Sequence, residues 1–256
     1  RQRACAGHRR AAVRSRPPRP HQRAIPLLRS GSRLSMESEG HTSSNTSSIR
    51  VPANAIAVHD WWKRPFDLVV LLAVHISLAP IWLALWTFIP LTIWLSDRGP
   101  VFYTQARVGK GGRIFRAYKF RSMVPDAERY TGAVWAEEDD PRITRVGRFL
   151  RSRALDELPQ VINMWKGDIS LVGPRPERPE LVEEFTQQWP EFGNRLAVRP
   201  GLTGIAQVYG RYSTHPRDKV RYDMIYVRRM SPWLDIKLLA LSVLITVRAR
   251  WQGEER

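Results

Sequence analysis

An almost unbroken apolar segment from Leu68 to Leu95 restricts what this chain can fold into more than any other feature. Its length of about 28 residues exceeds the roughly 20 that a helix needs to span a bilayer. Pro80 lies near its middle, where a proline removes one backbone hydrogen bond and bends a helix. Ser77 is close enough for its hydroxyl to satisfy a carbonyl group freed by such a bend. The segment therefore predicts a membrane helix with a break.

Basic residues lie on both sides of this segment, so the positive-inside rule gives no orientation for a crossing. Lys63 and Arg64 precede it, and Arg98 and Arg107 follow it. A helix that crosses the bilayer and a helix–break–helix that enters one leaflet and returns are equally compatible with the residues alone. A buried helix of a soluble protein is the third interpretation, and the length of the segment counts against it.

The chain as a whole is strongly basic, with a formal net charge of +17. Such a charge favours anionic partners: nucleic acid, phosphate-bearing substrates or an acidic membrane surface. The single cysteine, Cys5, excludes a disulfide or a cysteine-based metal site within one chain.

Much of the positive charge lies in residues 1–35, which contain no acid, and residues 36–58 are rich in Ser, Thr and Asn. We expect residues 1–58 to form a disordered tail. Because the first methionine is Met36, residues 1–35 are interpreted as a wrongly assigned start of translation. An Arg-rich transit peptide and a nucleic-acid-binding arm are the alternatives.

A β-hairpin is predicted after the apolar segment. Val101–Gln105 and Ile114–Arg121 have the residue pattern of strands, and the Gly-rich residues 107–113 between them suit a turn. Successive strand residues point to opposite faces of a sheet, so Lys119 and Arg121 share one face. This basic pair is a candidate binding site for substrate phosphate, and a solvated strand face is the alternative.

Two adjacent acids, Asp156 and Glu157, precede a predicted helix that runs to about Lys166 and ends at Gly167. Pro159 fits only the first turn of that helix, so Asp156 is expected to be its N-cap or a first-turn residue. Capping alone can explain the pair, but a helix N-terminus also favours phosphate. Because neighbouring helical residues diverge by about 100°, the two carboxylates can serve different roles.

Two rigid turns each present an arginine. The turn Gly173–Pro176 presents Arg175, and the turn Arg199–Gly204 presents Arg199. Prolines restrict the backbone of both turns, and a guanidinium group matches phosphate oxygens in two-pronged hydrogen bonding. Either turn alone would be an ordinary loop. Combined with the basic strand face and the acidic pair, the two turns predict a phosphate site.

Three further segments have simpler interpretations. Residues 125–140 are acidic and are expected to form a solvated loop, and Thr144–Leu155 is expected to be a helix. Trp233–Val247 is apolar but short for spanning a bilayer, so it is either a core helix or a helix in the membrane interface.

Six short motifs, in their order along the chain, resemble the bacterial sugar transferase family, the monotopic phosphoglycosyl transferases. The motifs are Lys63–Asp67, Tyr118–Met123, Asp140–Arg142, Leu155–Gln160, Gly173–Pro176 and Arg199–Gly204. The resemblance covers about residues 61–250. It implies a mixed α/β, mostly helical fold in a monotopic membrane protein.

The resemblance also implies how this fold is divided. Residues 59–98 would form a Pro-broken re-entrant membrane helix, with its break between Ser77 and Pro80. Residues 99–250 would form a cytoplasmic catalytic domain with a small β-hairpin and amphipathic interfacial helices. The family breaks this helix at a Ser-Pro pair, whereas Ala79 precedes the proline here.

The reaction implied by the resemblance transfers a sugar-1-phosphate from a UDP-sugar to undecaprenyl phosphate and releases UMP. It would take place at the cytoplasmic face of the bacterial inner membrane and initiate exopolysaccharide, capsule or lipopolysaccharide synthesis. Asp156 would be the nucleophile that forms a covalent intermediate, and Glu157 would bind Mg²⁺. The phosphate-binding candidates are Lys119, Arg121, Arg151, Arg175 and Arg199.

The expected partners are the UDP-sugar, undecaprenyl phosphate and the lipid bilayer, with a homodimer allowed and no nucleic acid. Hexose and N-acetylated amino sugar both stay open as the donor's sugar, with a hexose weakly favoured. The rival hypothesis is a non-enzymatic, membrane-anchored basic protein that binds nucleic acid or anionic lipid. That hypothesis leaves the pair Asp156 and Glu157 unexplained.

Overall fold

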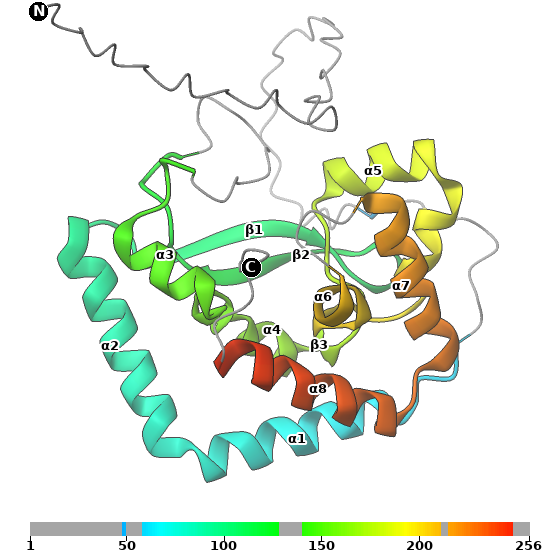
Figure 1. The fold of residues 1–256 in the computed structure, drawn as a ribbon, viewed down its shortest axis with the longest axis horizontal. Helices are drawn as coiled ribbons and strands as arrows, with labels where there is room; N and C mark the ends of the chain where they lie inside the picture. The colour runs from blue at the N-terminus through cyan, green and yellow to red at the C-terminus, as the bar shows by residue number, and fades with distance from the viewer. Residues whose placement is uncertain (1–47, 50–57, 128–139, 211–214, 248–256) are drawn as a thin grey trace, which may run out of the picture. The chain divides into compact units, whose positions relative to one another are not determined.

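The computed structural model describes residues 48–49, 58–127, 140–210 and 215–247, whose helices and strands are drawn in Figure 1. These residues form helices around two small, two-stranded sheets. The predicted mixed, mostly helical fold is therefore confirmed. The predicted N-terminal tail lies almost entirely outside the described residues, as does most of the acidic segment 125–140.

The long apolar segment forms two helices, α1 (Lys63–Ser77) and α2 (Ala79–Asp97), which meet at a sharp angle (Figure 1). Leu78 separates them with φ −112° and ψ 22°. Pro80 lies in the first turn of α2, where a missing N–H group costs little because it would have no partner inside the helix. The break thus lies where the proline predicts it, and the proline begins a helix instead of interrupting one.

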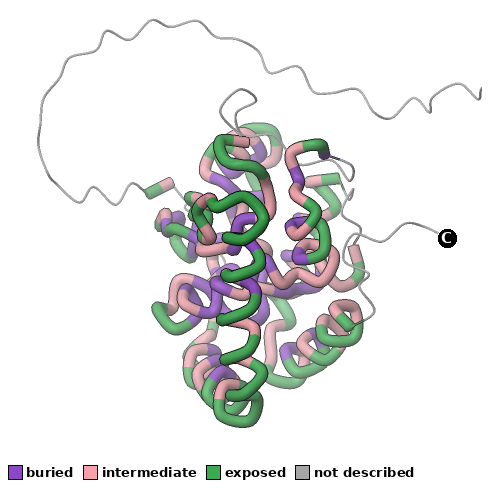
Figure 2. The backbone as a smooth tube through the Cα atoms, turned by 90° about the vertical axis from the view of Figure 1, so that its left-hand side faces the viewer, coloured by how far each residue is buried: buried purple, intermediate pink, exposed green. Residues whose placement is uncertain are grey.

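The residues of α2 are largely exposed, as the burial colours of Figure 2 show from the side on which this helix lies. Among the described residues it is the one helix long and apolar enough to cross a membrane by length and composition. Its exposed large side chains include Leu83, Phe88 and Leu95, and Val69 and Ile76 continue this apolar surface on α1. Contiguous apolar surface of this kind marks a site of contact with another phase or partner.

The predicted β-hairpin is present as β1 (Phe102–Val108) and β2 (Ile114–Phe120), paired antiparallel with Tyr103 opposite Lys119. The first strand runs three residues further than the sequence pattern indicates, up to the turn at Lys110–Gly112. Phe115 and Ala117 face the core, as alternation predicts. Phe120 on the opposite face is also buried, so both faces of β2 are covered.

A second, parallel sheet joins β3 (Ser170–Val172) to β4 (Gly201–Thr203). The remaining described helices and 3₁₀ turns are α3 (Arg145–Ser152), η2 (Leu155–Glu157), α4 (Gln160–Lys166), α5 (Pro179–Gln188), η3 (Pro190–Ala197), α6 (Ile205–Tyr209), α7 (Pro216–Arg229) and α8 (Pro232–Val247). The predicted helix over Thr144–Leu155 is therefore confirmed but shorter, with the Thr144 hydroxyl accepting from the Gly147 amide at 2.9 Å. The predicted C-terminal helix is confirmed as α8.

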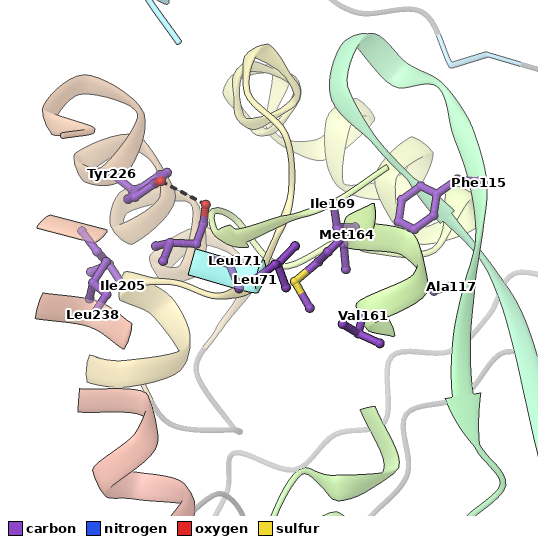
Figure 3. Packing of buried hydrophobic residues seen from close by; sticks show 11 residues of the cluster. Leu71, Phe115, Ala117, Val161, Met164, Ile169, Leu171, Ile205, Tyr226 and Leu238 are labelled. Atoms are coloured by element: carbon purple, nitrogen blue, oxygen red, sulfur yellow. Dashed lines mark hydrogen bonds between the residues drawn. The ribbon is translucent and has the colours of Figure 1, made fainter. Parts of the chain in front are cut away.

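The largest core cluster draws side chains from both sheets and from α1, α4, α6, α7 and α8 (Figure 3). Leu71 of α1 lies in it beside Val161 and Met164 of α4. The first half of the apolar segment is thus part of the core of the fold. The exposed apolar side chains of α1 and its core-facing side chains occupy different faces of this helix.

A buried charge network ties α1 to the same core. Lys63 forms ion pairs with Asp67 and with Asp235 of α8. The Tyr226 hydroxyl lies 2.9 Å from Asp235 Oδ1 and 3.0 Å from the Val172 carbonyl oxygen, the bond drawn dashed in Figure 3. All four side chains are almost completely buried. Burial raises the pKa of the Asp235 carboxyl, against the attraction of Lys63.

Candidate active site

Asp156 and Glu157 lie in the 3₁₀ turn η2, not at the N-terminus of an α-helix. The expectation that Asp156 caps the following helix is wrong, because α4 begins only at Gln160 and no side chain caps it. Bonds of 3₁₀ type, such as Val161 N to Leu158 O at 3.1 Å, carry the chain across Pro159. Proline has no N–H group, so the α-helical pattern becomes regular only after it. The predicted end at Gly167 is confirmed, with φ 85°.

Glu157 is buried and held by two cations. Lys119 Nζ lies 2.6 Å from its Oε1, and the Arg175 guanidinium contacts Oε1 at 2.5 Å and Oε2 at 3.3 Å. Burial alone would raise the pKa of this carboxyl, but Arg175 and Lys119 outweigh it and lower the pKa. Glu157 is therefore ionised, and two side chains from separate elements determine its position.

Asp156 is equally buried but differently surrounded. Within the described part of the chain, no hydrogen bond to its carboxylate is present. Burial raises the pKa of Asp156, the negative charge of Glu157 adds to this, and Lys119, Arg151 and Arg175 oppose it. A carboxylate without donors has two free oxygens, and poor solvation makes such oxygens better nucleophiles. The two neighbouring acids thus have opposite electrostatic behaviour.

The two Arg-Pro turns lie directly against each other. The Gly201 amide donates to the Pro174 carbonyl at 2.9 Å, and the Gly173 amide donates to the Thr203 carbonyl at 2.8 Å. A Cβ atom on Gly201 would lie 2.0 Å from Gly173 N, so only glycine fits there. This backbone contact fixes the turn from which Arg175 reaches Glu157.

The other phosphate-binding candidates are spread more widely. Arg151, near the end of α3, acts on Asp156 through its charge without a hydrogen bond to it. Arg121 pairs with Asp97 at the end of α2, not with the acidic pair, and its Nη1 has no hydrogen-bond partner among the described residues. The backbone of Arg199 packs on Gly173. The structure therefore gathers Lys119, Arg151 and Arg175 around the acidic pair and directs Arg121 elsewhere.

A second layer of charges supports the Arg175 turn, and the sequence patterns did not indicate it. Arg195 donates to the Arg175 carbonyl at 2.8 Å, and Arg107 donates to the Pro176 carbonyl at 2.9 Å. Arg195 also pairs with Asp223 at 2.8 Å. Burial raises the pKa of Asp223 to about 6, although Arg195 opposes the shift. None of these residues lies in a recognisable motif, and only their burial in the fold distinguishes them from other charged residues.

The oxygen atoms of the acidic pair suit a metal ion that is shared with substrate phosphates and water better than one bound by protein ligands alone. No group of three or more His, Cys, Asp or Glu side chains in the described ranges could hold a metal. Mg²⁺ is commonly bound by one or two carboxylates together with substrate phosphates and water. Among the described residues, Glu157 Oε2 has only the longer, 3.3 Å contact with Arg175. Two adjacent carboxylates, one of them with an oxygen weakly engaged, fit such a shared site.

A family model and several curated proteins match this chain. Residues 58–249 match the family model described as bacterial sugar transferase. The chain is 40% identical over 189 residues to the UDP-N-acetylgalactosamine-undecaprenyl-phosphate N-acetylgalactosaminephosphotransferase of Aeromonas hydrophila, covering 73% of this chain and 44% of the relative. It is 41% identical over 192 residues to the undecaprenyl-phosphate glucose phosphotransferase of Komagataeibacter xylinus, covering 71% of this chain and 35% of the relative.

A third relative, the undecaprenyl-phosphate galactose phosphotransferase of Salmonella typhimurium, is 36% identical over 200 residues, or 73% of this chain and 40% of the relative. The chain thus spans less than half the length of these three curated relatives. The residues that match the family model contain the acidic pair and both Arg-Pro turns.

Proposed function

Because this chain belongs to the bacterial sugar transferase family, we propose that it transfers a sugar-1-phosphate from a UDP-sugar to undecaprenyl phosphate and releases UMP. The names of all three relatives include undecaprenyl phosphate and a sugar phosphotransferase activity. One observation carries the proposal: Asp156 is buried beside Glu157 and has no hydrogen bond to its carboxylate from the described residues, while Lys119 and Arg175 hold Glu157 in place. This arrangement supplies a nucleophile next to charges that neutralise a diphosphate.

In the first step, a carboxylate oxygen of Asp156 attacks the phosphorus that bears the sugar. A bond forms between this oxygen and the phosphorus, and the bond from the phosphorus to the bridging oxygen breaks. UMP leaves with the electron pair of that bond. The product is an acyl phosphate, a mixed anhydride between the Asp156 carboxyl and the sugar phosphate, so one difficult displacement is divided into two.

In the second step, an oxygen of the lipid phosphate attacks the same phosphorus. The bond from the phosphorus to Asp156 breaks, the carboxylate is regenerated, and the lipid carries the sugar on a diphosphate. Each attack brings an anion towards an anion. Arg175, Lys119 and Arg151 offset this repulsion, and fixed charges of this kind act most strongly in a buried site.

We propose Mg²⁺ as the cofactor, with Glu157 as its protein ligand. When bound, the ion would supply further positive charge to the diphosphate oxygens. Binding through Glu157 would require part of its contact with Arg175 to be exchanged for a contact between Arg175 and the substrate.

We further propose that α1 and α2 enter one leaflet and return on the same side, with α8 in the membrane interface. Three observations support this: α1 has core contacts through Leu71, α2 is exposed and apolar, and α8 has exposed apolar side chains such as Trp233 and Val243. Basic residues at both ends of the apolar segment suit the cytoplasmic face. The reaction would then occur where lipid phosphate and soluble nucleotide sugar meet, at the inner membrane of a bacterium, and its product would initiate a polysaccharide.

The test is release of UMP by the full chain in membranes from a panel of UDP-sugars, with undecaprenyl phosphate and Mg²⁺. The relatives are named for N-acetylgalactosamine, glucose and galactose, so the panel contains at least these three sugars, and a hexose is our weak preference. We expect UMP with at least one donor and none without the lipid phosphate in multiple turnover. Absence of UMP with every donor would contradict the proposed function.

A further inference from the structure

Asn163 is completely buried in α4, and the mechanism above gives it no part. Its side chain nevertheless makes three hydrogen bonds. Oδ1 accepts from the Tyr118 amide at 3.0 Å, and Nδ2 donates to the Arg116 carbonyl at 2.8 Å and to Asp168 Oδ2 at 3.2 Å. Two of the three bonds therefore reach the backbone of β2.

These two bonds imitate the pairing of a neighbouring strand. β1 pairs with one edge of β2, and no strand pairs with its other edge among the described residues. In a parallel ladder, one residue of the neighbouring strand donates its N–H group to a carbonyl and accepts at its C=O group from the amide two residues further along. The amide group of Asn163 binds Arg116 and Tyr118 in this way. It closes the free edge of β2 and fixes the position of the strand along α4.

The residue after Tyr118 is Lys119, whose ammonium group lies 2.6 Å from Glu157. We propose that Asn163 is a positioning residue of the active site, which holds the strand that carries Lys119 against the helix that follows Glu157. The Lys119–Glu157 ion pair then depends on the Asn163 amide. This inference rests on the proposed function for its catalytic consequence, but not for the contact itself.

The other contacts between β2 and α4 are less directional. Val161 and Met164 pack against Phe115 and Ala117 in the core cluster, and apolar packing tolerates a small slide of one element along another. Lys166 donates to the Tyr118 hydroxyl at 3.0 Å, but this contact is exposed. A buried amide bonded to two backbone groups does not tolerate such a slide, because both groups would lose their partners.

The first measurement is the reactivity of the Lys119 amine towards an acylating reagent, read by mass spectrometry on the full chain in detergent. Asn163→Ala should label faster at Lys119 than the wild type. Asp168→Ala is the matched control, because it removes only the bond that does not reach β2, and its labelling should equal that of the wild type. Equal labelling of Lys119 in wild type and Asn163→Ala would overturn the proposal.

A second variant controls for the possibility that Asn163→Ala fails to fold. Asn163→Leu keeps about the same side-chain volume but can neither accept from Tyr118 nor donate to Arg116. It should also label faster at Lys119. In both variants, hydrogen exchange should become faster at the Tyr118 amide while the β1–β2 pairing stays protected. Unchanged exchange at Tyr118 would show that the contact is absent.

The catalytic consequence is tested by UMP release. Misplacing a catalytic group by about 1 Å can cost about 10²-fold, so kcat/KM of Asn163→Ala should fall by roughly that factor. Lys119→Met should lose at least as much, and the double variant should lose no more than Lys119→Met alone. Losses that multiply would show that Asn163 acts independently of Lys119 and would overturn the proposal.

The double variant separates positioning from a general loss of stability. A merely destabilised Asn163→Ala enzyme would lose activity in the Lys119→Met background as well, which would contradict positioning. If the wild type releases no UMP, the proposed function fails, and the labelling still decides the role of Asn163.

Discussion

At the scale of single residues, adjacent positions in one turn have opposite electrostatic properties. Glu157 is ionised because Arg175 and Lys119 outweigh the cost of its burial. The pKa of Asp156 is raised because burial dominates, and no donor among the described residues compensates for it. The presence of an acidic pair and of Arg175 could be predicted, because these residues stand out in the sequence. The opposite pKa shifts of the two acids could not be predicted, because they depend on Lys119, which approaches from a strand distant in the sequence.

Asp156→Asn should reduce UMP release by roughly 10⁴-fold or more, the scale of losing a nucleophile. The substitution removes a buried charge that has no hydrogen bond, so the thermal midpoint at neutral pH should be unchanged or higher. Activity would be measured by UMP release and stability by thermal denaturation in detergent. Turnover near the wild-type rate in Asp156→Asn would exclude this residue as the nucleophile.

Glu157→Gln should weaken the dependence on Mg²⁺. The metal concentration needed for half-maximal UMP release should rise at least about tenfold, an effect seen even for residues that only support a metal ligand. A direct check is Mn²⁺ binding followed by electron paramagnetic resonance, with Glu180→Gln on the surface of α5 as the control. The same metal titration in Glu157→Gln and wild type would argue against Glu157 as a ligand.

At the scale of elements, the bend between α1 and α2 is supported without the serine that precedes the proline in the family. His75 Nδ1 donates to the Leu71 carbonyl at 2.6 Å, since a carbonyl can only accept. The His75 ring stacks on Trp82 across the bend with centroids 4.5 Å apart, and Trp165 of α4 packs edge-on at 5.7 Å. The sequence predicts the place of the break from Pro80. It does not predict this stack, which forms only when the bend brings His75 and Trp82 together.

His75→Ala should therefore destabilise the protein by about 0.5–1.5 kcal/mol beyond the loss of buried area, the usual contribution of an aromatic pair. His75→Phe keeps the stack and should recover most of this loss. Thermal denaturation in detergent micelles would compare both with the wild type. An equal loss in His75→Phe and His75→Ala would mean that the hydrogen bond to Leu71, not the stack, supports the bend.

The buried ion pair between Lys63 and Asp235 links the same helix to α8. Lys63→Met should cost about 3–5 kcal/mol, because it leaves the carboxylates of Asp67 and Asp235 buried without their cation. Adding Asp235→Asn should restore part of this stability, since one of the two uncompensated charges is then removed. Both variants would be compared by denaturation in lipid nanodiscs. A double variant less stable than Lys63→Met alone would contradict this explanation.

At the scale of the whole molecule, one face of helix α1 lies in the protein core and another face is exposed. Leu71 of α1 lies in the core with β3 and α8, whereas Val69 and Ile76 of the same helix are exposed. A helix anchored in this way cannot move away from the catalytic region without opening its core. This favours return to the same side of the membrane over a crossing.

The sidedness of the segment can be measured directly. In a Cys5→Ser background, single cysteines at His59 and Ser96 would be labelled with a membrane-impermeant maleimide. If the segment returns, both positions should react in inverted membrane vesicles and neither in intact spheroplasts. Labelling of the two positions from opposite sides would establish a crossing helix.

The sequence by itself determined the features that depend on local chemistry. Pro80 sets the break, Gly167 ends α4, the Gly-rich residues 109–113 turn the hairpin, and the motif order indicates the family. Only the tertiary structure decided which cations reach the acidic pair. Lys119 and Arg175 bind Glu157, Arg121 pairs with Asp97, and Asn163 and Arg195 hold the backbone around them. The reason is physical: these partners are far apart along the chain, and ion pairs and pKa shifts depend on distance and burial, which exist only after the elements have packed.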